Sequence, residues 1–209
     1  KMDKYEEAIS QYQKAIKLNP AYAQGYYNLG LAYAKVGELD KAIESYQKAA
    51  THNPKHSAAR YNLGIAYMRQ ERYDLAIKEY QQAIKLNPKF APAYRNIGMA
   101  YSQMEQFDAA IKSFKKALSF NPNDAKSHYH IALALFYKDN FAEAIEEYKA
   151  AIEITPDDVE IRRNLGIAYT KTKQYEEALL EFHKAVELDD RDHLAHYYMA
   201  SCLDETGEP

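Results

Sequence analysis

Apolar residues recur at steps of three and four along nearly the whole chain, with polar residues between them. In the first segment the apolar stripe consists of Tyr5, Ile9, Tyr12 and Ile16. This period places apolar side chains on one face of an α-helix. The same pattern returns in each following segment after a short polar stretch. It predicts an all-α chain of about twelve amphipathic helices.

Proline marks the spacing of these helices. Five of the seven prolines stand 34 residues apart, at Pro20, Pro54, Pro88, Pro122 and Pro156, and the next such position holds Asp190. A proline lacks the backbone N–H and disfavours helix in the residue before it, so each is expected to end a helix. A fixed period of this length indicates a repeat protein in which each unit is a pair of helices.

Counting from Ala23 as position 1, we predict full repeats at residues 23–56, 57–90, 91–124, 125–158 and 159–192, with half-repeats at 1–22 and 193–209. Position 8 is small in every full repeat, and positions 20 and 27 are always alanine. Position 24 is always aromatic, as Tyr46, Tyr80, Phe114, Tyr148 and Phe182. Small residues let paired helices approach closely, and the ring is expected to fill the gap between repeats. Stacked repeats then share one continuous apolar core.

The period and these positions resemble the tetratricopeptide repeat family over essentially the whole chain. The resemblance implies a right-handed superhelical α-solenoid of stacked antiparallel helix pairs, whose first helices line a concave groove for protein ligands. Two positions depart from the family pattern and put the local turn geometry in question more than the fold. Position 15 is glycine at Gly37 but elsewhere Glu71, Glu105, Asp139 and Lys173. Position 4, often Trp in the family, is Tyr26, Arg60, Tyr94, His128 and Arg162.

The resemblance places positions 2, 5, 6, 9, 12 and 13 of each first helix on the groove. Position 6 holds Asn28, Asn62, Asn96, His130 and Asn164, and position 5 holds Tyr27, Tyr61, Arg95, Tyr129 and Arg163. An amide side chain both donates and accepts, which suits the backbone of an extended peptide. The arrangement is similar to the asparagine ladder of the O-linked N-acetylglucosamine transferases; the alternative is that Asn is simply common at this position. Position 9 is apolar throughout, which argues against the carboxylate clamp of co-chaperones.

Charge sharpens the prediction for the groove. Its positions carry the cations Lys35, Arg69, Arg95, Lys126, Arg163 and Lys171 against one acid, Glu160. The whole chain has a net charge of −3, so the acids are expected mainly on the second helices. A basic groove with tyrosines favours an extended peptide that carries acidic or phosphorylated residues. The alternative is that these long side chains are merely solvated.

No reactive constellation stands out, and neither a metal nor a cofactor is expected. His193 and His196 follow Asp189, Asp190 and Asp192, but their spacing matches no specific metal site, and an acidic helix cap is preferred. The net charge gives no reason to expect nucleic acid, and no apolar run reaches the length of a membrane span.

The sequence therefore predicts a protein–protein interaction scaffold in the cytoplasm that binds a peptide in its groove and is not itself an enzyme. The apolar stripe of the first segment suggests a missing upstream helix, and hence a fragment of a longer protein. Two alternatives stay open: a substrate-recruiting region of a larger enzyme such as a glycosyltransferase, and a structural scaffold that associates end to end. RNA binding is a weaker alternative, because the groove is basic but the chain is not.

Overall fold

The computed structural model describes residues 2–207, and every regular element in that range is a helix. The first six helices are α1 (Met2–Leu18), α2 (Ala23–Lys35), α3 (Leu39–His52), α4 (Ser57–Arg69), α5 (Tyr73–Leu86) and α6 (Ala91–Gln103). The next six are α7 (Phe107–Leu118), α8 (Ala125–Tyr137), α9 (Phe141–Ile154), α10 (Val159–Lys171), α11 (Tyr175–Leu188) and α12 (His193–Thr206). The prediction of an all-α chain of about twelve helices is confirmed. Residues 1 and 208–209 of the predicted half-repeats lie outside the described residues.

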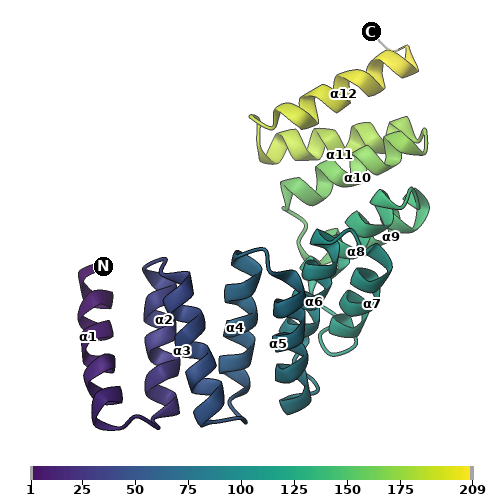
Figure 1. The fold of residues 1–209 in the computed structure, drawn as a ribbon. Helices are drawn as coiled ribbons and strands as arrows, with labels where there is room; N and C mark the ends of the chain where they lie inside the picture. Colours follow the sequence, from purple (N-terminus) through teal and green to yellow (C-terminus); the bar gives the residue numbers. More distant parts are fainter. Residues whose placement is uncertain (1, 208–209) are drawn as a thin grey trace. The chain divides into compact units, whose positions relative to one another are not determined.

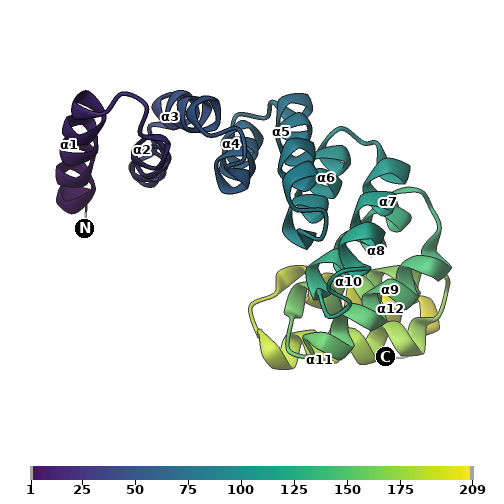
Figure 2. The same cartoon turned by 90° about the horizontal axis from the view of Figure 1, so that it is seen from below.

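Two compact units divide the chain. The first unit ends at Met104 and contains α1 to α6, which pack in chain order from α1 on α2 to α5 on α6 (Figure 1). Within it, α2 and α4 lie side by side and α3 lies on one side of them (Figure 2). The second unit begins at Glu105, and in it α7 to α12 also pack in chain order, with an added contact between α10 and α12. Packing of each helix on its neighbours in sequence is the architecture of an α-solenoid.

The residues that define the repeat form the core. All alanines at positions 20 and 27 have no exposed surface, and neither do the rings of Tyr80, Phe114 and Phe182 at position 24. In three repeats the ring lies directly over the position 8 glycine of its own repeat: Tyr46 over Gly30, Tyr80 over Gly64 and Phe182 over Gly166. A Cβ added at Gly64 would stand 2.6 Å from Tyr80 Cε1, closer than real Cβ atoms come to other atoms. The ring therefore packs inside its own helix pair and also contacts the next repeat, as Phe114 does on His130 and Phe182 does on Tyr198.

Helix ends follow the proline period. The helices α1, α3, α5 and α9 each end two residues before a proline, and α7 ends four residues before Pro122. α11 ends at the same repeat position, at Leu188, although Asp190 stands where the proline would be. Proline thus ends the second helices as predicted, but the helix also ends where proline is absent.

The turn inside each helix pair is the same with or without glycine. Gly37 has a φ of 84°, and Glu71, Glu105, Asp139 and Lys173 all have φ between 57° and 60°. After α4, the N–H of Arg72 donates to Tyr67 O at 3.0 Å and the N–H of Glu71 donates to Met68 O at 3.0 Å. These two bonds form a Schellman motif, which requires a left-handed residue at this point. The expected disturbance of turn geometry is therefore absent from these turns, and the cost appears as backbone strain instead.

Position 4 is joined to position 23 of the same repeat in three of the five full repeats. In three repeats the pair consists of a base and a glutamate, 2.7–2.9 Å apart: Arg60–Glu79, His128–Glu147 and Arg162–Glu181. In the first full repeat position 23 is Ser45, and Tyr26 stacks on the His52 ring at a centroid distance of 5.3 Å. These contacts occupy the place that the family often gives to Trp.

Candidate functional site

The asparagines at position 6 are tied to the tyrosines at position 5 of the preceding repeat. The Nδ2 group donates to the tyrosine hydroxyl in Asn62–Tyr27 at 3.0 Å, Asn96–Tyr61 at 3.1 Å and Asn164–Tyr129 at 3.1 Å. Asn28 instead accepts a bond from Gln24 Nε2 at 3.0 Å. Each of the three asparagine side chains thus uses an N–H donor inside the protein. Their Oδ1 atoms accept no hydrogen bond within residues 2–207.

A rule links the identities of the residues at these junctions. Where position 5 is Tyr (Tyr27, Tyr61, Tyr129), position 24 is Tyr and the next repeat has Asn at position 6. Where position 5 is Arg (Arg95, Arg163), position 24 is Phe and the next repeat has a ring at position 6. Those rings stack on the phenylalanine: His130 on Phe114 at 5.4 Å and Tyr198 on Phe182 at 6.1 Å. The asparagines therefore take part in one of two ways in which neighbouring repeats pack: Asn on Tyr, or a ring on Phe.

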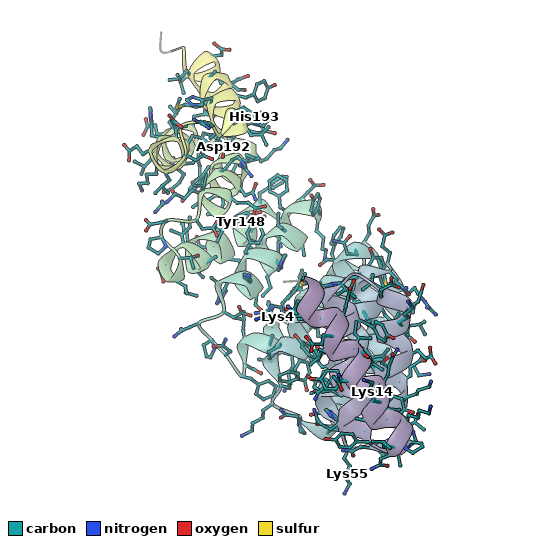
Figure 3. All side chains as sticks on the ribbon, turned by 90° about the vertical axis from the view of Figure 1, so that its left-hand side faces the viewer. Lys4, Lys14, Lys55, Tyr148, Asp192 and His193 are labelled. Carbon is teal, nitrogen blue, oxygen red and sulfur yellow. The ribbon has the colours of Figure 1, made fainter. Side chains whose placement is uncertain are left out.

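Position 5 also packs on the last residue of its own repeat. Tyr27 lies 4.6 Å from the His56 ring and Tyr61 lies 4.8 Å from the Phe90 ring, measured between centroids. The Arg163 guanidinium stands 2.6 Å from Asp192, whose side chain is 5% exposed. Figure 3 shows Asp192 beside His193 at the start of α12. This pair neutralises one of the six cations that the sequence assigns to the groove.

Asp192 is the acidic helix cap that the sequence predicts. Its Oδ1 accepts the N–H groups of Leu194 at 3.2 Å and Ala195 at 3.1 Å. Burial alone would raise the pKa of this carboxyl, but the bonds from Ala195 and Arg163 outweigh it and hold the pKa below its usual range. No cluster of three or more metal-binding side chains occurs in the part of the chain that the structure describes.

One concave site lies between α2 and α4 in the first unit. It is a pocket of about 170 Å³ lined by Leu31, Ala34, Lys35, Leu39, Tyr46, Asn62, Ile65, Ala66 and Arg69. Side chains from positions 6, 9 and 13 of the first helices α2 and α4 thus meet in one pocket. The position 9 side chains Leu31 and Ile65 are half-buried.

The charged groups of this pocket are Lys35 and Arg69. Both side chains are exposed, and neither has an ion-pair partner within residues 2–207. Tyr46 adds a hydroxyl: burial raises its pKa, nearby Tyr27 acts in the same direction, and Arg69 only partly opposes them. At neutral pH this hydroxyl is therefore an uncharged hydrogen-bond donor. The pocket combines two cations, an amide oxygen and an apolar lining.

The second unit places its predicted site residues in more internal contacts. Tyr129 donates to Glu160 Oε1 at 2.8 Å, and burial, then this bond and the charge of Glu160, raise the pKa of the Tyr129 hydroxyl. Lys126 and Lys171 are exposed, whereas Arg95 in the first unit is half-buried. Tyr137 stands at position 13, where the first unit has Lys35 and Arg69, and it is 66% exposed. Each unit thus holds three of the six predicted groove cations, and in the second unit Arg163 is paired with Asp192.

Comparison with known sequences decides the family. The sequence model for the C-terminal domain of cilia and flagella-associated protein 70 matches residues 21–208, and a general tetratricopeptide repeat model matches residues 1–37. The chain belongs to the tetratricopeptide repeat family. Proteins built of such repeats are generally scaffolds for protein–protein interaction rather than enzymes. No curated protein sequence matches this tetratricopeptide repeat chain significantly.

Solved structures of tetratricopeptide repeat proteins share the fold. YrrB, described as having an unusual peptide-binding site, is 25% identical, with a TM-score of 0.74 over 89% of this chain and 96% of that chain. MamA is 27% identical, with a TM-score of 0.75 over 81% of this chain and 92% of its own. PilF from Pseudomonas aeruginosa is 19% identical, with a TM-score of 0.78 over 95% of this chain and 90% of that chain. This likeness supports the fold alone. Within residues 2–207 no helix combines the length and apolar character needed to cross a membrane.

Proposed function

We propose that this tetratricopeptide repeat chain binds an extended acidic segment of a partner protein in the pocket between α2 and α4. The observation that carries the proposal is the position of Lys35 and Arg69, two exposed cations without ion-pair partners in residues 2–207, on one apolar pocket. A carboxylate between them would gain charge-assisted hydrogen bonds, which are about twice as strong as neutral ones.

The rest of the lining suits the backbone and the apolar side chains of such a segment. Leu31, Leu39 and Ile65 offer apolar surface, while Asn62 Oδ1 can accept a peptide N–H. The Tyr46 hydroxyl can donate to a peptide carbonyl. Peptide ligands commonly combine backbone hydrogen bonds for affinity with pockets for alternate side chains.

Spacing defines the acidic motif. Lys35 and Arg69 occupy position 13 of consecutive repeats, and neighbouring helices pack roughly 8–10 Å apart. An extended peptide advances about 3.3 Å per residue, so the two cations match acidic residues about three positions apart. YrrB, a relative of the same fold, is described as having a peptide-binding site, which supports the peptide as the class of ligand.

A peptide array tests the proposal. Peptides of about a dozen residues with acidic pairs at spacings from one to five are probed with the wild-type chain and with the Lys35→Glu/Arg69→Glu variant. The control variant Lys78→Glu/Lys85→Glu changes the net charge equally at two exposed lysines of α5, outside the pocket. We expect the pocket variant to lose at least about tenfold in affinity, since each charge-assisted bond contributes about 1.5–3 kcal/mol. Equal loss in both variants would mean that net charge, not the pocket, binds the peptides.

A further inference from the structure

A second pocket of about 450 Å³ lies between α1, α2 and α3 in the first unit. It shares no lining residue with the pocket between α2 and α4. Ile16 and Leu29 contribute apolar surface to it, and Ser45 contributes a buried hydroxyl. Lys17, Lys41 and Lys48 also line it, from two different helices.

The repeat that holds this pocket lacks the ion pair that joins positions 4 and 23 in three other repeats. Ser45 stands at position 23, where Glu79, Glu147 and Glu181 reach the base at position 4 in three later repeats. The Ser45 hydroxyl donates to Lys41 O of its own helix at 2.7 Å, so it does not reach across. No glutamate side chain therefore reaches from position 23 toward position 4 in this repeat, and both Tyr26 and Ser45 line the pocket.

The side chains around this space are predominantly positive. Lys41 lies 5.7 Å from the centre of the Tyr33 ring and 3.2 Å from Glu38 Oε2. Lys48 pairs with Glu44 at 2.6 Å, and this bond raises the pKa of Lys48, so its ammonium group stays charged. Lys17 is exposed and has no ion-pair partner within residues 2–207. Three ammonium groups therefore line the pocket against one carboxylate, that of Glu44.

We propose that this pocket is a second binding site for a partner protein, which inserts a glutamate or aspartate side chain beside an apolar one. The inserted carboxylate takes the place that Glu79 occupies in the next repeat, with Lys17, Lys41 and Lys48 in the role that Arg60 plays there. The neighbouring apolar side chain of the partner covers Ile16 and Leu29. Burial of a carboxylate needs such compensating charge and hydrogen bonds.

Filling the pocket with the chain's own ion pair gives a selective test. The double variant Tyr26→Arg/Ser45→Glu copies the Arg60–Glu79 pair into the first full repeat, and the chain already uses this type of pair in three repeats. The probes are fluorescein-labelled peptides of about a dozen residues with a fixed central Glu–Leu pair and varied flanks. Each peptide that binds the wild-type chain is measured again by fluorescence anisotropy against the double variant. Far-UV circular dichroism verifies that the variant is folded.

For peptides held in this pocket we expect the double variant to raise Kd at least about tenfold, the equivalent of one charge-assisted bond. A second variant, Lys17→Gln/Lys41→Gln, leaves the pocket open and should weaken Glu–Leu peptides but not the matching Gln–Leu peptides. The Lys35→Glu/Arg69→Glu variant should leave these Kd values unchanged, which separates this site from the one between α2 and α4. The proposal is overturned if no Glu–Leu peptide binds saturably, or if every Kd stays within twofold in the Tyr26→Arg/Ser45→Glu variant.

Discussion

Three ion pairs differ in burial, and each loses its glutamate in one of the variants Glu181→Ala, Glu79→Ala and Glu44→Ala. We expect the loss of stability to be largest for the most buried pair. Arg162 and Glu181 are the most buried pair, with each side chain 12% exposed and 2.7 Å between Nη1 and Oε2. Without Glu181 the guanidinium would keep one bond, from Nε to Pro156 O at 2.8 Å. Glu181→Ala therefore leaves the nearly buried Arg162 guanidinium with one of its two hydrogen bonds.

The magnitude follows from exposure. Breaking a fully buried pair by removing one partner costs about 3–5 kcal/mol. The bond to Pro156 and the remaining access to water reduce this, so we expect Glu181→Ala to lower the free energy of unfolding by about 2–3 kcal/mol. Glu79→Ala removes the partner of Arg60. The side chains of Arg60 and Glu79 are 28% and 13% exposed, so this variant should lower the free energy of unfolding by about 1–2 kcal/mol. Glu44→Ala removes an exposed partner of Lys48 and should cost less than about 1 kcal/mol.

Urea unfolding followed by far-UV circular dichroism measures all three variants against the wild-type chain. Repeat arrays unfold by local units, so the curves are fitted with a nearest-neighbour model rather than a two-state one. Glu181→Gln is the control for charge, because it keeps the size of the side chain and one acceptor oxygen; it should cost less than Glu181→Ala. If Glu181→Ala costs no more than Glu44→Ala, burial does not set the energy of these pairs.

Three further predictions concern the turns, the core and the cap. Glu71 holds a φ of 58°, so Glu71→Gly should raise the free energy of unfolding by about 0.5–1 kcal/mol in urea titrations, and a loss of stability would contradict the strain. Gly64→Ala places a Cβ 2.6 Å from the Tyr80 ring and should lower the melting temperature, at a cost of about 1–3 kcal/mol; an unchanged temperature would mean that the ring moves freely. The lowered pKa of Asp192 stabilises the fold above the unfolded pKa of about 4, and this contribution is lost as the pH falls through the folded value. Asp192→Asn should therefore flatten the dependence of the urea midpoint on pH below about pH 4, and an unchanged slope would refute this.

Most of the fold could be predicted because the residues that define it repeat at fixed positions. The alanines, the ring at position 24 and the small residue at position 8 each have one structural task in every repeat. Turn residues were harder to interpret. Glu71 and Lys173 break the expected glycine pattern, yet they adopt the same left-handed conformation as Gly37. A Schellman motif held by two backbone bonds tolerates this strain, and side-chain identity does not reveal such compensation.

The candidate site was predictable in position but less so in its contacts. The side chains of Lys35, Asn62 and Arg69 meet in one pocket, as their repeat positions imply. The bond from Asn62 to Tyr27 was not predicted, because it depends on the register between neighbouring helix pairs rather than on position along one helix. The joint variation of positions 5, 24 and 6 was a readable signal for it. The same register pairs Arg163 with Asp192, which lowers the positive charge expected for the groove.

A reciprocal charge swap tests most directly whether the pocket between α2 and α4 binds acidic segments. The dissociation constant of an array-selected peptide is measured for the wild-type chain and for Lys35→Glu/Arg69→Glu, each with the original peptide and with a version whose two acids are changed to lysine. The account predicts that the original peptide binds the wild-type chain and the lysine version binds the variant, with each mismatched pair at least about tenfold weaker. If the lysine peptide fails to bind the folded variant while the original peptide binds both chains equally, the pocket is not the site.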